Sequence, residues 1–163
     1  MATVDTPIPI LLDRHATQAE VEEVAAVFKR AGFRPKVRPV WEKKPQTGNG
    51  PFWVVLVLLG ISFKAFADGF FGRYGENAAD ALREFVRELR EARRLSTHAD
   101  DGWIMVDDGD DTEVMLAGDL PEEAYHALFD LDWPSYTGGM LIWDEDTREW
   151  YDPNRRYAIE PDE

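Results

Sequence analysis

The chain has 163 residues, and it contains no cysteine, which excludes disulfides, thiolate metal sites and a cysteine nucleophile. Apolar residues make up 44% of it, enough for a hydrophobic core despite a net charge of −14. Residues 1–99 carry 15 Lys and Arg against 12 Asp and Glu, whereas residues 100–163 carry 3 against 20, a net of −17. Such a block repels nucleic acid and attracts a cationic protein.

The length predicts one domain over residues 1–163. Within it we distinguish a basic-to-neutral half (1–99), an acidic half (100–152) and a frayed polar tail (153–163). Arg outnumbers Lys 13 to 5, which is typical of a GC-rich bacterial genome. The N-terminus lacks a basic segment followed by an apolar stretch, so we expect no secretory signal and a cytoplasmic protein.

The first predicted elements form a β-α-β unit. Residues 8–12 are apolar and strand-like, and Thr17 begins the pattern T-x-x-E with Glu20, which is a capping box at a helix N-terminus. Gly32 ends that helix. Residues 33–40 follow as a second strand, and their two prolines favour a place at the edge of a sheet.

The most ambiguous segment is 52–71. Its first part is strand-like in composition, but later phenylalanines recur at helical spacing, and we predict mostly helix. The charge-free run 52–63 has twelve residues, too few to span a bilayer, which favours a buried core element. A membrane-surface role for 52–71 stays open as an alternative. The next predicted helix, 77–94, has the clearest apolar stripe, formed by Ala78, Leu82, Phe85, Val86, Leu89 and Ala92.

The acidic half predicts two hairpins flanking a short helix. Residues 103–106 and 113–117 form the first hairpin, and residues 140–143 and 148–151 form the second. The helix between them should hold Pro121 in its first turn. The prediction is therefore a single α+β domain: a β-α-β unit, two central helices and these two hairpins, with the helices on one face of a mixed sheet.

Carboxylates gather in both hairpin turns. The spacing of the first turn does not match an EF-hand loop, and Asp and Gly are the usual residues of solvated turns, so we predict no metal site. A shared metal would need the two turns to lie side by side. Aromatic residues on the loop 133–139 are typical of an interaction site. The predicted partner-binding residues are Trp133, Tyr136, Asp107, Asp108, Asp110, Asp111, Asp144, Glu145 and Asp146.

Signatures of catalysis are weak in this chain. Asp13 and His15, at a strand-to-helix junction, are the best catalytic candidates. The sequence lacks a zinc-type histidine pair and a glycine-rich phosphate loop, which predicts no metal and no cofactor. A basic stripe on the helix 77–94 could bind phosphate or carboxylate groups, face the acidic half or face solvent, and we favour the solvated face because glutamates lie among the arginines. The stripe comprises Arg83, Arg87, Arg90 and Arg94.

The sequence thus favours a non-enzymatic interaction or regulatory module whose acidic surface binds a cationic protein. Two alternatives stay open beside it. One is a metal-dependent or hydrolytic enzyme that uses the acidic turns or Asp13 and His15, and the other is a membrane-surface protein that uses residues 52–71.

Overall fold

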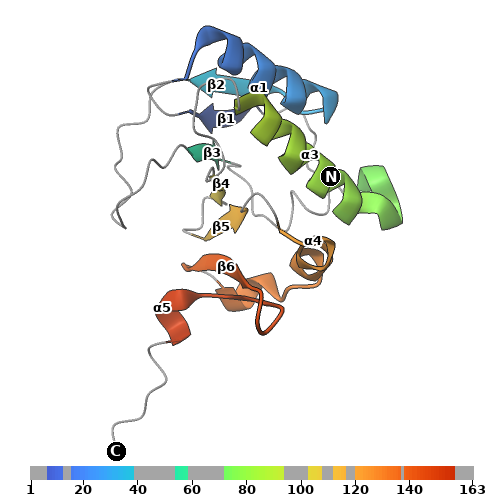
Figure 1. Cartoon of the computed structure of the whole chain (residues 1–163), viewed down its shortest axis with the longest axis vertical. Coiled ribbons are helices and arrows are strands. Elements are labelled where there is room, and N and C mark those ends of the chain that lie inside the picture. Colours follow the sequence, from blue (N-terminus) through green and yellow to red (C-terminus); the bar gives the residue numbers. More distant parts are fainter. Residues whose placement is uncertain are drawn as a thin grey trace, which may run out of the picture.

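The computed structural model describes residues 7–12, 16–38, 54–58, 72–93, 103–107, 112–116, 120–136 and 138–156. Helices and strands both contribute to this part of the chain, which places it in the α+β class. Its strands form one sheet in the order β2-β1-β3-β4-β5-β6-β7 (Figure 1). Parallel and antiparallel neighbours alternate across the sheet, so the predicted mixed sheet is confirmed.

The N-terminal β-α-β unit is present. Strand β1 (Ile8–Leu11) and strand β2 (Pro35–Arg38) are parallel, and α1 (Gln18–Arg30) connects them. The capping box forms: the Thr17 N–H donates to Glu20 Oε2 at 2.7 Å, and the Glu20 N–H donates to Thr17 Oγ1 at 3.3 Å. Strand β2 lies at the edge of the sheet, as predicted. Its first residue is Pro35, and an edge strand tolerates a proline because it is paired on one side only.

The prediction of mostly helix over 52–71 is wrong where the structure describes that segment. Residues 54–58 form strand β3 (Val54–Leu58), which pairs antiparallel with β1 and parallel with β4 (Trp103–Asp107). A strand paired on both sides reads as a continuous apolar run, and a run this short does not reveal its period. The rest of 52–71 lies outside the described residues. Within the described part of the chain, no helix is long and apolar enough to cross a membrane.

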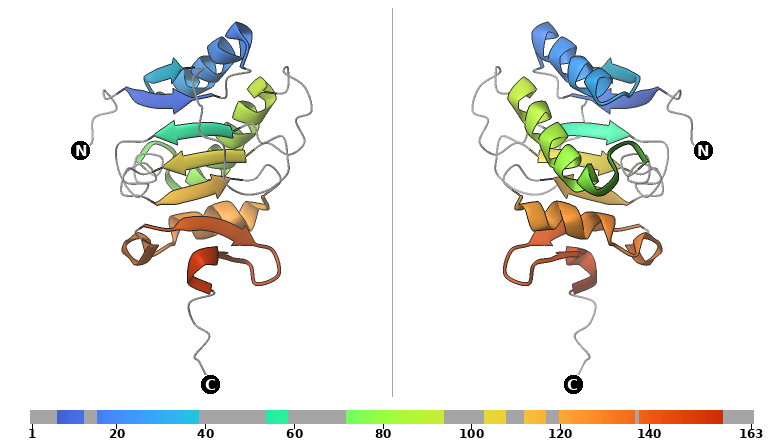
Figure 2. Two further views of the ribbon diagram at one scale, coloured as in Figure 1. Left: turned by 90° about the vertical axis from the view of Figure 1, so that its left-hand side faces the viewer. Right: turned by 90° about the vertical axis from the view of Figure 1, so that its right-hand side faces the viewer.

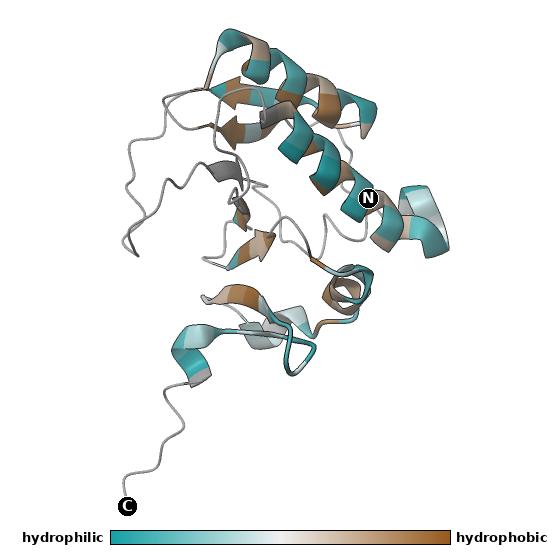
Figure 3. Ribbon diagram, in the orientation of Figure 1, coloured by the Kyte–Doolittle hydropathy of each residue, from teal (hydrophilic) through white to brown (hydrophobic). Residues whose placement is uncertain are grey.

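Helix α3 (Ala78–Arg93) follows the short helix η1 (Gly75–Asn77). All six residues of its predicted apolar stripe are buried. The Phe85 ring meets the Phe28 ring of α1 edge to face, with centroids 4.9 Å apart. Bands of hydrophobic and hydrophilic residues alternate along both helices (Figure 3). Figure 2 shows α1, α3 and α4 on the same face of the sheet, as predicted.

Both predicted hairpins of the acidic half are confirmed. Strand β4 pairs antiparallel with β5 (Glu113–Leu116), and β6 (Met140–Asp144) pairs antiparallel with β7 (Glu149–Tyr151). Between the hairpins lie α4 (Glu122–Phe129) and the short helix η4 (Trp133–Tyr136).

Two details of the acidic half differ from the prediction. Pro121 is the N-cap residue of α4 and not part of its first turn, since its extended ψ of 157° places it just outside the helix. The tail predicted from residue 153 begins with one helical turn, α5 (Pro153–Arg156). That turn forms because the Asp152 carboxylate, through Oδ1, accepts a hydrogen bond from the Asn154 N–H at 2.9 Å.

Strand direction separates Asp107, at the end of β4, from the acidic turn between β6 and β7. Strands β5 and β6 are parallel, with Glu113 beside Met140. Glu113 begins β5 beside Asp107, the last residue of β4, whereas the β6–β7 turn follows β6, so that turn lies at the opposite end of the sheet from Asp107 and Glu113 (Figure 2). We call the end at which β5 begins the Thr112 end, and the opposite end, where the β6–β7 turn lies, the Arg148 end.

Candidate functional site

A buried hydroxyl organises the Thr112 end. Thr112 is 2% exposed, and its Oγ1 donates to the carbonyl of Tyr136 at 3.1 Å and accepts from the Gly138 N–H at 3.3 Å. The Glu113 N–H donates to the Gly139 carbonyl at 2.9 Å. The start of β5 therefore holds the C-terminal end of the loop that contains η4.

A second buried polar group lies beneath the same loop. Asp152 is 6% exposed, and a Cβ added to Gly139 would lie 2.2 Å from its Oδ2, so glycine is needed for this close approach. Arg155 lies with its Nε 3.6 Å from the same Oδ2 and also donates to the Ser135 carbonyl. The Asp152 carboxylate thus caps α5 and is balanced by a guanidinium that also contacts η4.

The Thr112 end brings together part of the predicted partner surface. Trp133 and Tyr136 are half-buried and pack against the core. Asp107, also half-buried, ends β4 opposite Glu113 and therefore lies at this end of the sheet. Asp108, Asp110 and Asp111 lie outside the described residues. The sequence did not single out Asp132, which is exposed here and accepts a hydrogen bond from Ser135 Oγ at 2.6 Å.

The remaining predicted partner residues lie at the Arg148 end. Asp144 Oδ1 accepts from the Asp146 N–H at 2.9 Å and from the Thr147 N–H at 3.2 Å, so this side chain shapes the turn. Glu145 and Asp146 are exposed. Arg148, with a φ of 56°, places its Nε 3.6 Å from Glu123 Oε1 in the first turn of α4. Those of the predicted residues that the structure describes therefore lie at two ends of the sheet and do not form one surface.

The basic stripe of α3 contacts the acidic half through Arg83. Arg83 Nη1 lies 3.6 Å from Glu122 Oε2 of α4. Arg87 pairs within α3 with Glu84, whose hydrogen bond and charge raise the pKa of this guanidinium. Arg90 is half-buried, and Arg94 lies outside the described residues. At Arg83, therefore, the stripe contacts the acidic half of the same chain.

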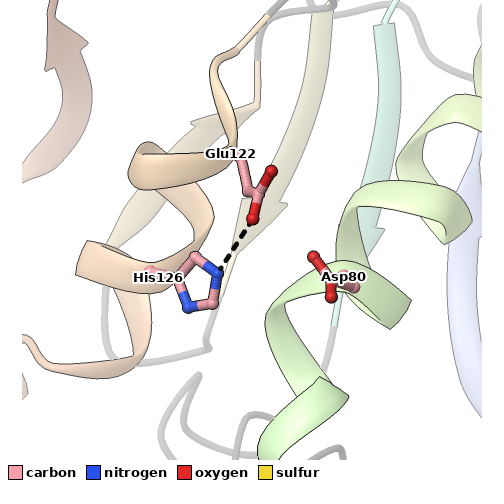
Figure 4. A group of neighbouring side chains, drawn as sticks. All are labelled: Asp80, Glu122 and His126. Atoms are coloured by element: carbon pink, nitrogen blue, oxygen red, sulfur yellow. Dashed lines mark ion pairs between the residues drawn. The ribbon is translucent and has the colours of Figure 1, made fainter.

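Three potential metal ligands meet where α3 packs against α4. They are Asp80, in the first turn of α3, and Glu122 and His126, one turn apart on α4 (Figure 4). All three are exposed, and one ligand atom of each lies within 4.8 Å of the others. Glu122 Oε1 is 3.6 Å from His126 Nε2.

The sequence signal for this cluster was incomplete. Glu122 and His126 have the i, i+4 spacing that places two side chains on one helix face. A zinc motif made of two histidines does not include a Glu–His pair, so this pair was not recognised. Asp80 is more than forty residues earlier in the chain, and no sequence pattern relates it to the pair. The predicted catalytic candidates Asp13 and His15 lie outside the described residues.

A small cavity of about 170 Å³ lies between α1 and α3. Its apolar lining includes Val27, Ala81 and Phe85. Arg30 and Glu88 also line it, and their ion pair joins the helices at 2.9 Å between Nη2 and Oε2. Tyr74 and Glu84 complete the polar part of its lining.

Comparisons with known proteins leave the fold and these sites as the basis for function. No family model, no curated protein and no solved structure matches the chain.

Proposed function

We propose that this chain is a non-enzymatic interaction module that binds a cationic protein at the Thr112 end of its sheet. The observation that carries the proposal is the pair of hydrogen bonds that Thr112 Oγ1 makes, one as donor and one as acceptor, which hold the η4 loop at the end of the sheet where Asp107 ends β4. This arrangement places the aromatic rings of the η4 loop at the same end of the sheet as the Asp107 carboxylate. The hydrogen bonds to Thr112 hold the loop backbone in place before a partner binds.

Each component suits a cationic partner. Aromatic faces attract Lys and Arg side chains by about 0.5–1 kcal/mol at exposed sites. Carboxylates supply charge complementarity, which raises the rate of encounter and selects against acidic partners. A loop already held in place loses less conformational entropy on binding. The charge of −17 over residues 100–163 adds a long-range attraction that salt screens beyond about 8–10 Å.

The alternatives are less well supported by the described residues. Asp107 lies at the opposite end of the sheet from Asp144, so a metal shared between these two carboxylates has no support. The membrane-surface alternative rests on a segment of which the described part, 54–58, is an interior strand of the sheet.

The test uses a short oligolysine peptide as the cationic probe and the full chain, with binding followed by fluorescence anisotropy. One variant carries Asp107→Asn with Asp132→Asn at the Thr112 end. Its matched control carries Glu145→Gln with Asp146→Asn at the Arg148 end, which removes the same charge. We expect the first variant to bind at least about tenfold more weakly, equal to about 1.4 kcal/mol. We expect the control to change much less.

Salt and folding complete the design. Affinity of the wild-type chain should fall steeply with added salt, and circular dichroism should show both variants folded. Equal losses in the two variants would mean that net charge alone attracts the probe, and the proposed site would be rejected. Absence of binding at low salt would reject the interaction itself.

A further inference from the structure

We propose that Asp80, Glu122 and His126 bind a divalent transition-metal ion of the Zn²⁺ type, which joins α3 to α4. This inference is independent of the proposed partner surface, because the three ligands lie where α3 packs against α4, away from the η4 loop at the Thr112 end.

The geometry of the cluster is close to that of a metal site. Zn²⁺ holds nitrogen and oxygen ligands at about 2.0–2.2 Å, which sets donors of a tetrahedral site about 3.3 Å apart. The separation of 3.6 Å between Glu122 Oε1 and His126 Nε2 is already near this value. Asp80 is exposed on the neighbouring helix, and one of its carboxylate oxygens lies within 4.8 Å of the ligand atoms of Glu122 and His126 (Figure 4). Rotation of the exposed side chain can bring this oxygen to the distance that a bound ion requires.

The ligand types select the metal. Imidazole nitrogen suits Zn²⁺, Cu²⁺, Ni²⁺ and Fe²⁺, whereas Mg²⁺ and Ca²⁺ prefer sites made entirely of oxygen. The two carboxylates balance the charge of a divalent ion. Three protein ligands also leave a fourth tetrahedral position for water.

Arg83 supports the orientation of one ligand. Its Nη1 lies 3.6 Å from Oε2 of Glu122, so the other oxygen, Oε1, stays available on the side of His126. A charged group that holds the outer oxygen of a ligating carboxylate orients that ligand. Within this arrangement a bound ion would connect a helix of the basic-to-neutral half with a helix of the acidic half.

The test is calorimetric titration of the full chain with ZnCl₂, and with MgCl₂ as the oxygen-preferring comparison. The variants are Asp80→Asn and His126→Gln, each of which removes one ligand from one of the two helices. Glu123→Gln is the matched control, because it removes an exposed carboxylate of the same α4 turn outside the cluster. Zn²⁺ should bind with a stoichiometry of one, and Mg²⁺ should bind far more weakly.

Each ligand variant should weaken the binding of Zn²⁺ by more than about tenfold, since even the loss of a residue that only orients a ligand lowers metal affinity by about 10–100-fold. Zn²⁺ should also raise the melting temperature of the wild-type chain and of the Glu123→Gln control, and at the same Zn²⁺ concentration it should raise that of either ligand variant by less. A loss of affinity in His126→Gln without one in Asp80→Asn would place the ion on α4 alone and overturn the interhelical site. Binding unaffected by both variants, or no binding, would also overturn it.

Discussion

Replacing Thr112 by Val tests whether one hydroxyl holds the η4 loop. Valine has nearly the same shape but makes neither hydrogen bond, so the Gly138 N–H loses its partner and the Tyr136 carbonyl keeps only the longer bond from the Gly139 N–H, at 3.3 Å. A buried polar group left without its partner costs about 1–3 kcal/mol. In a chain of this length, that loss lowers the melting temperature by about 2–12 °C.

The control for this variant is Thr112→Ser, which keeps the hydroxyl and loses one methyl group, worth about 0.8 kcal/mol. Urea unfolding, followed by the fluorescence of the six tryptophans and by circular dichroism, measures both free energies. We expect the valine variant to be the less stable of the two and to bind the oligolysine probe more weakly. A valine variant as stable as the serine variant would refute the role given to the hydroxyl.

Two further predictions concern the same half of the molecule. Gly139→Ala should destabilise the chain by about 1–3 kcal/mol, because the new methyl group meets the buried Asp152 carboxylate and packing must shift to admit it; unfolding within 0.5 kcal/mol of wild type would show that the carboxylate moves aside freely. Trp150→Phe should cost about 1–3 kcal/mol in urea unfolding, since the Trp150 Nε1–H donates to the Ala124 carbonyl at 2.8 Å in a buried position and links β7 to α4. An unchanged midpoint for this variant would mean that the indole N–H contributes nothing to that contact.

Prediction from sequence succeeded where the signal is local. The capping box of Thr17 and Glu20 forms as predicted, and Gly32 ends α1 with a φ of 85°. The apolar stripe of α3 is buried throughout. These features depend on residues three or four positions apart, whose spacing a helix imposes directly. The prediction for residues 54–58 failed because a short apolar run suits a central strand and a buried helix equally well.

The sequence by itself determined the α+β class, the β-α-β unit, both hairpins and the concentration of negative charge after residue 99. Only the tertiary structure decided that β3 lies between β1 and β4, and that β5 and β6 run parallel. Those pairings place Asp107 and Asp144 at opposite ends of the sheet, and the packing of α3 against α4 places Asp80 beside Glu122 and His126. The physical reason is that strand order and helix packing come from contacts between residues distant in the chain, whereas side-chain periodicity reports which face of an element is buried and not what covers it.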